Sequence, residues 1–218
     1  PRLLGAVTDA DLSDDAFPLY RMCHIHIGHA PVFAQRLSFT GETGWEIFVT
    51  PDFAEHVLEI ILKAGQPLGL RLAGGEALNA LRIEKGFLHW GADMAYTEAP
   101  YQLGLDFICK PGKTLPFIGQ DACLARKADP KGPCLRSVRL ADPDAILHHN
   151  EPVLRDGQII GFVTSGAFCA MQKAAVGLCL VSPPDTAGGF EAVDDGPCSV
   201  MVEGREVPAE LRRKPFGA

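Results

Sequence analysis

The sequence predicts an α+β fold in two parts: a mixed sheet with helices over residues 1–130, then a small antiparallel β-barrel or sandwich over residues 131–218. In the first part, strand-like runs of alternating apolar and polar residues are interspersed with helical runs. In the second part, short strand-like runs alternate with glycine-containing turns. Between them, residues 129–133 combine two prolines, a glycine and charges, so we place the domain boundary near residue 131.

The expected elements of the first part follow one another as strand, hairpin, helix, connection and helix. Alternation over residues 22–28 predicts a strand. A helix begins at Pro51 and stops at Gly65, and a second helix over residues 76–85 breaks at Gly86. Residues 100–109 predict a buried strand, and residues 121–128 predict a short helix.

Residues 37–49 predict a β-hairpin, because apolar and polar residues alternate on both sides of the turn at residues 41–44. Glu46 shares a strand face with Phe48 in a segment otherwise suited to burial. A buried carboxylate is unfavourable unless it accepts hydrogen bonds. Its partner is either an arginine of this chain or a ligand with two adjacent N–H groups, such as the pyrimidine edge of a pterin.

The second part contains six strand-like runs. They span residues 135–140, 152–154, 159–163, 174–181, 198–202 and 206–207. The turns between them are expected at residues 156–157, 165–166, 188–189 and 203–204, each of which contains glycine.

Composition excludes several classes of protein. The hydrophobic content of 47% and charged content of 22% are typical of a soluble globular protein. The net charge of -7 argues against nucleic acid as a partner, and no apolar run is long enough for a transmembrane helix. Seven cysteines without a C-x-x-C motif predict reduced thiols, in the cytoplasm or, in a eukaryote, the mitochondrial matrix. The chain opens on Pro1 rather than Met, so we expect that a preceding segment exists.

Three further positions have candidate roles. His24 and His26 share a strand face, but no carboxylate or cysteine with matching spacing accompanies them, so we expect no metal site. Arg82 points to a different helix face from Glu84 and needs another partner, either Glu46 or a ligand carboxylate. Trp90 precedes a glycine and is suited to form a ring wall for a planar ligand.

Several motifs, in order and spacing, resemble the aminomethyltransferase family, typified by the glycine cleavage T-protein. They lie at residues 39–46, 81–86, 100–105 and 117–119, and residues 161–166 and 208–216 resemble that family's terminal barrel. Residues 84–86 followed by residues 89–91 are similar to the folate-binding half of dimethylglycine and sarcosine dehydrogenases.

The resemblance implies a tetrahydrofolate site. It implies that Glu46 holds the pterin ring, and that Phe39, where the family usually has tyrosine, flanks the ring by packing alone. Trp45, Trp90 and Arg82 complete the implied folate-binding residues.

The implied chemistry is transfer of a one-carbon unit from an amine-linked donor to N5 of tetrahydrofolate. In the family, the acid/base aspartate and much of the folate cradle come from a first domain that precedes the part matched here, so the catalytic residue of this chain is unknown. Leu78 occupies the position of a T-protein arginine, which weakens a straight glycine-cleavage assignment. Two functions therefore stay open: a folate-dependent transferase, alone or as part of an amine demethylase, and a non-catalytic folate-binding or scaffold module.

Overall fold

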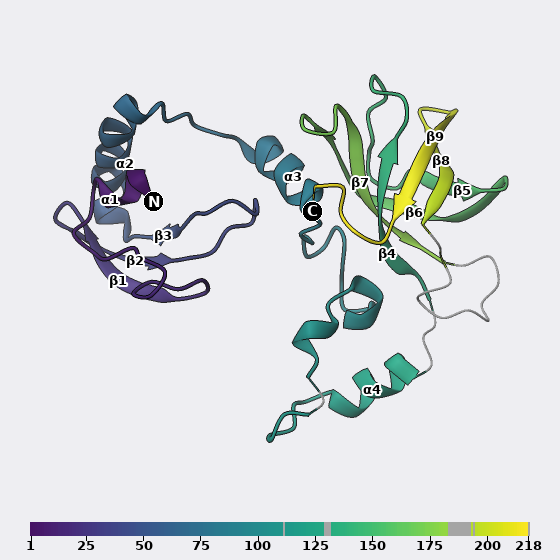
Figure 1. The fold of residues 1–218 in the computed structure, drawn as a ribbon, viewed down its shortest axis with the longest axis horizontal. Coiled ribbons are helices and arrows are strands. Elements are labelled where there is room, and N and C mark those ends of the chain that lie inside the picture. The colour runs from purple at the N-terminus through teal and green to yellow at the C-terminus, as the bar shows by residue number, and fades with distance from the viewer. Residues whose placement is uncertain (111, 129–131, 183–192, 194, 218) are drawn as a thin grey trace. The chain divides into compact units, whose positions relative to one another are not determined.

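The chain divides into two units, residues 1–75 and residues 76–218, which are considered separately (Figure 1). The structure is a computed structural model that describes residues 1–110, 112–128, 132–182, 193 and 195–217. The predicted boundary near residue 131 and the predicted turn at residues 188–189 lie outside the described residues, and both stay predictions.

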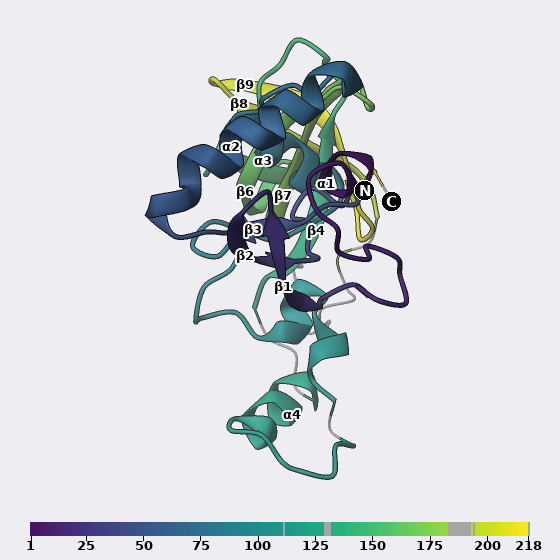
Figure 2. The same cartoon turned by 90° about the vertical axis from the view of Figure 1, so that its left-hand side faces the viewer.

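A three-stranded antiparallel sheet in the order β1-β2-β3 forms the centre of unit 1. Its elements are α1 (Arg2–Gly5), β1 (Met22–Ile27), β2 (Ala30–Gln35), β3 (Glu46–Phe48), α2 (Pro51–Gly65) and the short 3-10 helix η1 (Gln66–Leu68). Both helices α1 and α2 lie on the same side of the sheet (Figures 1 and 2). Leu4 and Val57 from these helices join buried sheet residues such as Ile27 and Val32 in one apolar core. The sheet therefore has one covered face and one face that carries exposed side chains.

The hairpin predicted over residues 37–49 is only half present. The second strand of the hairpin forms as β3, but it pairs with β2 rather than with residues 37–40, with Phe33 opposite Phe48 and Gln35 opposite Glu46. Residues 37–45 form a loop instead of the expected first strand. Here the Ser38 hydroxyl accepts a hydrogen bond from the backbone N–H of Thr40 and lies 2.9 Å from its hydroxyl, and such local bonds compete with strand pairing.

The predicted helices are confirmed as α2, α3 (Gly75–Glu84) and α4 (Gln120–Ala128). The strand predicted over residues 100–109 is wrong, because this segment forms the 3-10 helices η2 (Pro100–Leu103) and η3 (Asp106–Ile108). Pro100 opens η2, the Gln102 side chain accepts a hydrogen bond of 2.8 Å from the backbone N–H of Ala99, and Gly104 ends the turn with φ +70°.

Six antiparallel strands close into a barrel in the order β4-β7-β6-β5-β8-β9, with β9 pairing back onto β4. They are β4 (Cys134–Leu140), β5 (Pro152–Arg155), β6 (Gln158–Cys169), β7 (Ala174–Val181), β8 (Gly196–Val202) and β9 (Arg205–Arg212). The inward residues are mostly valine and leucine, including Val138, Val153, Val163, Val181, Val200 and Leu211. The predicted barrel is thus confirmed.

The turn predicted at Ser165 and Gly166 is wrong, because both residues lie inside β6. A side chain at position 166 would overlap the backbone of Leu147. The glycine therefore allows a close approach of two backbone segments rather than a reversal of the chain. Among the described helices, none has the length and apolar character needed to span a membrane.

Candidate functional site

Glu46 begins β3 and is exposed, which corrects the premise that its charge is buried. The carboxylate is exposed because it lies on the face of the sheet opposite the apolar core, and its neighbour on the same face, Phe48, is also exposed. No burial penalty therefore requires a ligand at Glu46. What the position offers is an accessible pair of acceptor oxygens at the rim of an open sheet face.

Three aromatic side chains cross this open face next to Glu46 and form what we call the aromatic row: His24, Phe33 and Phe48. Phe33 lies opposite both His24 in β1 and Phe48 in β3, and the rings of His24 and Phe33 lie 3.7 Å apart between centroids. Phe33 is 42% exposed and Phe48 is 48% exposed. On this face the pair of Gln35 and Glu46 lies next to the pair of Phe33 and Phe48. The sheet register thus places the Glu46 carboxylate beside an exposed aromatic surface.

Trp45 does not share this face. Side chains alternate along a strand, so Trp45 and Ile47 point to the helix side, where both pack against the apolar core of unit 1. The Trp45 ring meets Phe17 edge-on at 6.2 Å, and the guanidinium of Arg36 lies 5.7 Å from its centre. Trp45 also lines a cavity of about 290 Å³ with residues of α1 and α2. Phe39 is half-buried in the loop before β3.

In unit 2, Arg82 is buried at 3% exposure near the end of α3. Its guanidinium donates to acceptors at four places: Asn79 Oδ1 at 2.9 Å, the Phe87 carbonyl at 3.1 Å, Ser165 Oγ at 2.7 Å, and Asp93 Oδ2 in a buried ion pair. The partner that the sequence left open is therefore Asp93. These bonds give Arg82 a structural role within unit 2, and its assignment as a folate ligand stays a prediction that this geometry does not favour.

Asp93 is fully buried and accepts hydrogen bonds from three segments. Besides Arg82 in α3, the donors are the backbone N–H of His89 at 2.9 Å and the hydroxyl of Thr164 in β6 at 2.6 Å. Sequence reasoning missed Asp93, because its partner Thr164 is 71 residues away along the chain. The only local signal was Arg82 without an obvious partner.

Trp90 stands on the loop of residues 87–94, which we call the Trp90 loop. Its side chain is 64% exposed. Behind it, the backbone N–H of Gly91 donates to the Met94 carbonyl at 2.8 Å, and that of Asp93 donates to the His89 carbonyl at 2.9 Å. The indole is therefore presented outward on a closed turn.

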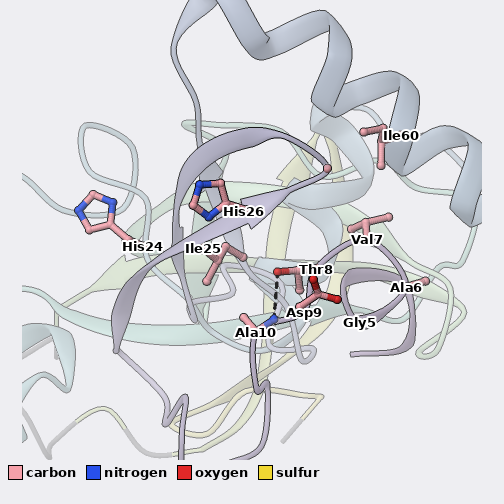
Figure 3. Close-up of a pocket in the computed structure, with 11 residues that line it drawn as sticks. Gly5, Ala6, Val7, Thr8, Asp9, Ala10, His24, Ile25, His26 and Ile60 are labelled. Atoms are coloured by element: carbon pink, nitrogen blue, oxygen red, sulfur yellow. Dashed lines mark hydrogen bonds between the residues drawn. The ribbon is translucent and has the colours of Figure 1, made fainter.

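A second cleft of about 700 Å³ lies in unit 1 between residues 5–10 and β1 (Figure 3). Thr8 and Asp9 line it from one side, and His24 and His26 from the strand. None of the five residues that the resemblance implies lines this cleft. Among the described residues, no cluster of three or more His, Cys, Asp or Glu side chains is arranged to hold a metal ion.

Comparison with known proteins identifies the family to which this chain belongs. A model described as the GCVT N-terminal domain matches residues 1–113, and one described as the glycine cleavage T-protein C-terminal barrel domain matches residues 134–217. The chain belongs to the glycine cleavage T-protein family. This finding confirms the resemblance on which the folate interpretation depends.

Relatives within the T-protein family are longer proteins. The 4-methylaminobutanoate oxidase (formaldehyde-forming) of Paenarthrobacter nicotinovorans is 40% identical, covering 98% of this chain and 25% of that protein. Human mitochondrial dimethylglycine dehydrogenase is 35% identical, covering 99% and 24%. The aminomethyltransferase of Porphyromonas gingivalis is 29% identical, covering 98% and 58%. The chain thus spans about a quarter of the length of the oxidase and of the dehydrogenase.

The T-protein fold also appears among solved structures. The glycine cleavage system aminomethyltransferase T from Bartonella henselae superposes with a TM-score of 0.73 at 22% identity, covering 85% of this chain and 49% of that one. At this identity the likeness concerns the fold alone.

Proposed function

We propose that this chain is the folate-binding part of a tetrahydrofolate-dependent one-carbon transferase, alone or within a larger amine demethylase. The supporting observation is the accessible carboxylate of Glu46 beside the aromatic row, in a member of the T-protein family. A pterin has a flat ring, which suits an aromatic surface, and adjacent N–H groups on one edge, which suit a carboxylate. These residues fit the chemistry of the cofactor.

In this proposal, Glu46 orients the pterin by accepting two of its N–H groups. Phe39, on the segment before β3, stays in the proposed site as a ring contact. Trp45 packs against the core of unit 1, so the geometry does not favour its predicted ring contact. The folate contact predicted for Trp90, which lies in unit 2, stays a separate proposal. We propose that the donor is an amine-linked one-carbon unit. This agrees with the name of one relative, 4-methylaminobutanoate oxidase (formaldehyde-forming), which refers to a methylamino compound. When bound, tetrahydrofolate supplies the nitrogen that accepts the carbon. The chain's part is to fix that nitrogen against the donor and to exclude water.

The anionic tail of folate needs positive charge. Arg36 has acceptors within unit 1, because its guanidinium bonds to Asp14 at 2.6 Å and to the Phe17 carbonyl at 2.7 Å. Arg82 is likewise bonded within unit 2. We therefore propose that the tail is held by a preceding domain or a partner subunit, in keeping with the greater length of the relatives.

Calorimetric titration with tetrahydrofolate tests the proposal. Glu46→Gln keeps the shape of the side chain and removes its charge, so we expect binding to weaken by roughly 1.5–3 kcal/mol, the range for a hydrogen bond to a charged group. Glu42→Gln is the matched control, because Glu42 is an exposed carboxylate in the same segment outside the proposed site. Equal affinity of wild type and Glu46→Gln would overturn the assignment of Glu46.

A non-catalytic folate-binding or scaffold module is the alternative. This alternative also predicts that the chain binds folate, but it predicts no transfer of a one-carbon unit to folate. In the natural full-length protein supplied with tetrahydrofolate and an aminomethyl donor, whose carbon is already at the oxidation level of methylene, transfer of that carbon to folate with release of the amine supports the transferase. Folate binding without transfer supports the module. The seven free cysteines fit a reducing compartment, and we propose the cytoplasm or, in a eukaryote, the mitochondrial matrix.

A further inference from the structure

The Trp90 loop is fastened at both ends to one buried ion pair. At its start, Arg82 donates to the Phe87 carbonyl, and the backbone N–H of Phe87 donates back to the Arg82 carbonyl at 2.8 Å. Further along, Asp93 accepts from the backbone N–H of His89 at 2.9 Å. Because Arg82 and Asp93 also bond to each other, the loop closes into a ring of hydrogen bonds with charged members.

The same ion pair is anchored to the barrel. Thr164 and Ser165 are consecutive residues of β6, and their hydroxyls bond to opposite members of the pair. Thr164 donates to Asp93 at 2.6 Å, and Ser165 accepts from Arg82 at 2.7 Å. Asp93 therefore joins three segments, namely the end of α3, the Trp90 loop and the barrel wall.

A buried ion pair contributes little net free energy to holding a surface loop in place. Removing two charges from water offsets most of their attraction, and apolar residues of similar size often stabilise a fold as well or better. A large exposed indole also gains nothing for folding, because its apolar surface stays in water. What the arrangement does provide is a fixed direction, since charged hydrogen bonds restrict geometry more than apolar contacts do.

We propose that Asp93 is a positioning residue: through Thr164 and the His89 backbone it fixes the Trp90 loop to the barrel, so that the Trp90 ring is a rigid wall for a planar ligand. This rests on the proposed function only for the identity of that ligand, tetrahydrofolate. Asp93 itself is buried and acts through the loop.

Two neighbouring hydroxyls of β6 give a matched test. Thr164→Val removes the donor to Asp93 at nearly constant volume. Ser165→Ala removes a hydroxyl of the same network that bonds to Arg82 rather than to Asp93. Thr164→Ser restores the hydroxyl and is the rescue variant. The chain contains two tryptophans, Trp45 and Trp90, so fluorine NMR of the 5-fluorotryptophan-labelled chain reports on the loop with an internal reference in unit 1.

With Thr164→Val, we expect the Trp90 resonance to narrow and to move toward its position in the unfolded chain, while the Trp45 resonance is unchanged. Ser165→Ala and Thr164→Ser leave both resonances as in wild type. If Thr164→Val leaves the Trp90 resonance unchanged, or if Ser165→Ala changes it equally, the positioning role is wrong. Asp93→Asn, which keeps the size of the side chain, must give the same Trp90 signature as Thr164→Val.

Tetrahydrofolate titration of the same variants separates this inference from the proposed function. Loss of a fixed Trp90 ring should weaken binding by about three- to tenfold, the effect of weakening one aromatic contact. If the Trp90 resonance responds and affinity does not, Asp93 still positions the loop, and Trp90 is not a folate contact. If Glu46→Gln also has no effect on affinity, the proposed folate site itself fails.

Discussion

The backbone N–H of Gly217 donates a hydrogen bond of 2.9 Å to the carbonyl oxygen of Glu84 and so caps the C-terminal end of α3. A side chain at position 217 would place its Cβ 2.7 Å from that same oxygen. Gly217→Ala should therefore lower the free energy of unfolding by about 1–3 kcal/mol, the usual effect of overpacking. Thermal and urea unfolding measure the change. Gly112→Ala, at a position with open space around it, is the control and should be near neutral.

The ion pair of Arg82 and Asp93 should be far more sensitive to the loss of one partner than to the loss of both. Asp93→Ala leaves the Arg82 charge buried without its partner, so it should lower the free energy of unfolding by about 3–5 kcal/mol. Arg82→Met combined with Asp93→Leu removes both charges and should lower the free energy of unfolding much less. The comparison is the pair of half-buried Arg36 and exposed Asp14, and Asp14→Ala should lower the free energy of unfolding by less than about 1 kcal/mol, because Asp14 is open to water. If Asp93→Ala and Asp14→Ala lowered the free energy of unfolding equally, the expected cost of leaving a buried charge without its partner would be contradicted.

Glu210 should make the barrel sensitive to acid. The hydrogen bond from Arg212 holds the pKa of Glu210 below its ordinary value of 4.5, and the charges of Arg212 and Arg139 act in the same direction. Both guanidiniums lie over the ring of Phe216, at 4.7 Å and 5.0 Å. Because the folded pKa is depressed, this stabilisation is present above pH 4.5 and is lost as pH falls through the folded pKa.

The measurement for Glu210 is the melting temperature as a function of pH. Wild type should melt higher than Glu210→Gln near pH 7, and the two curves should converge once the pH falls below the depressed folded pKa of Glu210. A constant difference across that range would show that the charge of Glu210 does not stabilise the fold.

The thiols should differ widely in reactivity. Burial, together with the negative charge of Glu84, raises the pKa of Cys169 to about 11, and burial raises the pKa of Cys179 beyond this. At pH 8 almost no thiolate is present at either position, so iodoacetamide should modify half-buried Cys23 and Cys123 before Cys169 and Cys179. Mass spectrometry of the labelled native chain gives the order. Labelling of Cys169 at the rate of Cys23 would contradict the buried environment.

Sequence reasoning succeeded where a pattern is local. The helices α2, α3 and α4 follow from periodicity and from the proline and glycine that bound α2, and the six barrel strands follow from short apolar runs between turns. It failed over residues 100–109, because a short apolar run fits a strand and a buried 3-10 turn equally well, and the Gln102 side chain decided between them.

The site was harder to predict than the fold. Glu46 was correctly placed in a strand, but its exposure depends on which face of the sheet the helices cover, which alternation alone does not reveal. The bond from Thr164 to Asp93 joins segments far apart in the chain, and a sequence contains no local trace of it. Phe33, which forms the middle of the aromatic row, was not identified, because the sequence analysis did not predict strand β2.

Pairing of β4 with β9 has a consequence for biosynthesis. The first and last strands of the barrel are adjacent in space, so the ring cannot close until the segment containing Arg205–Arg212 has left the ribosome. Until then β4 has an unsatisfied edge, whereas unit 1 has already been translated and can begin to fold. Nascent chains that stall before β9 should therefore be the species that most needs chaperone protection.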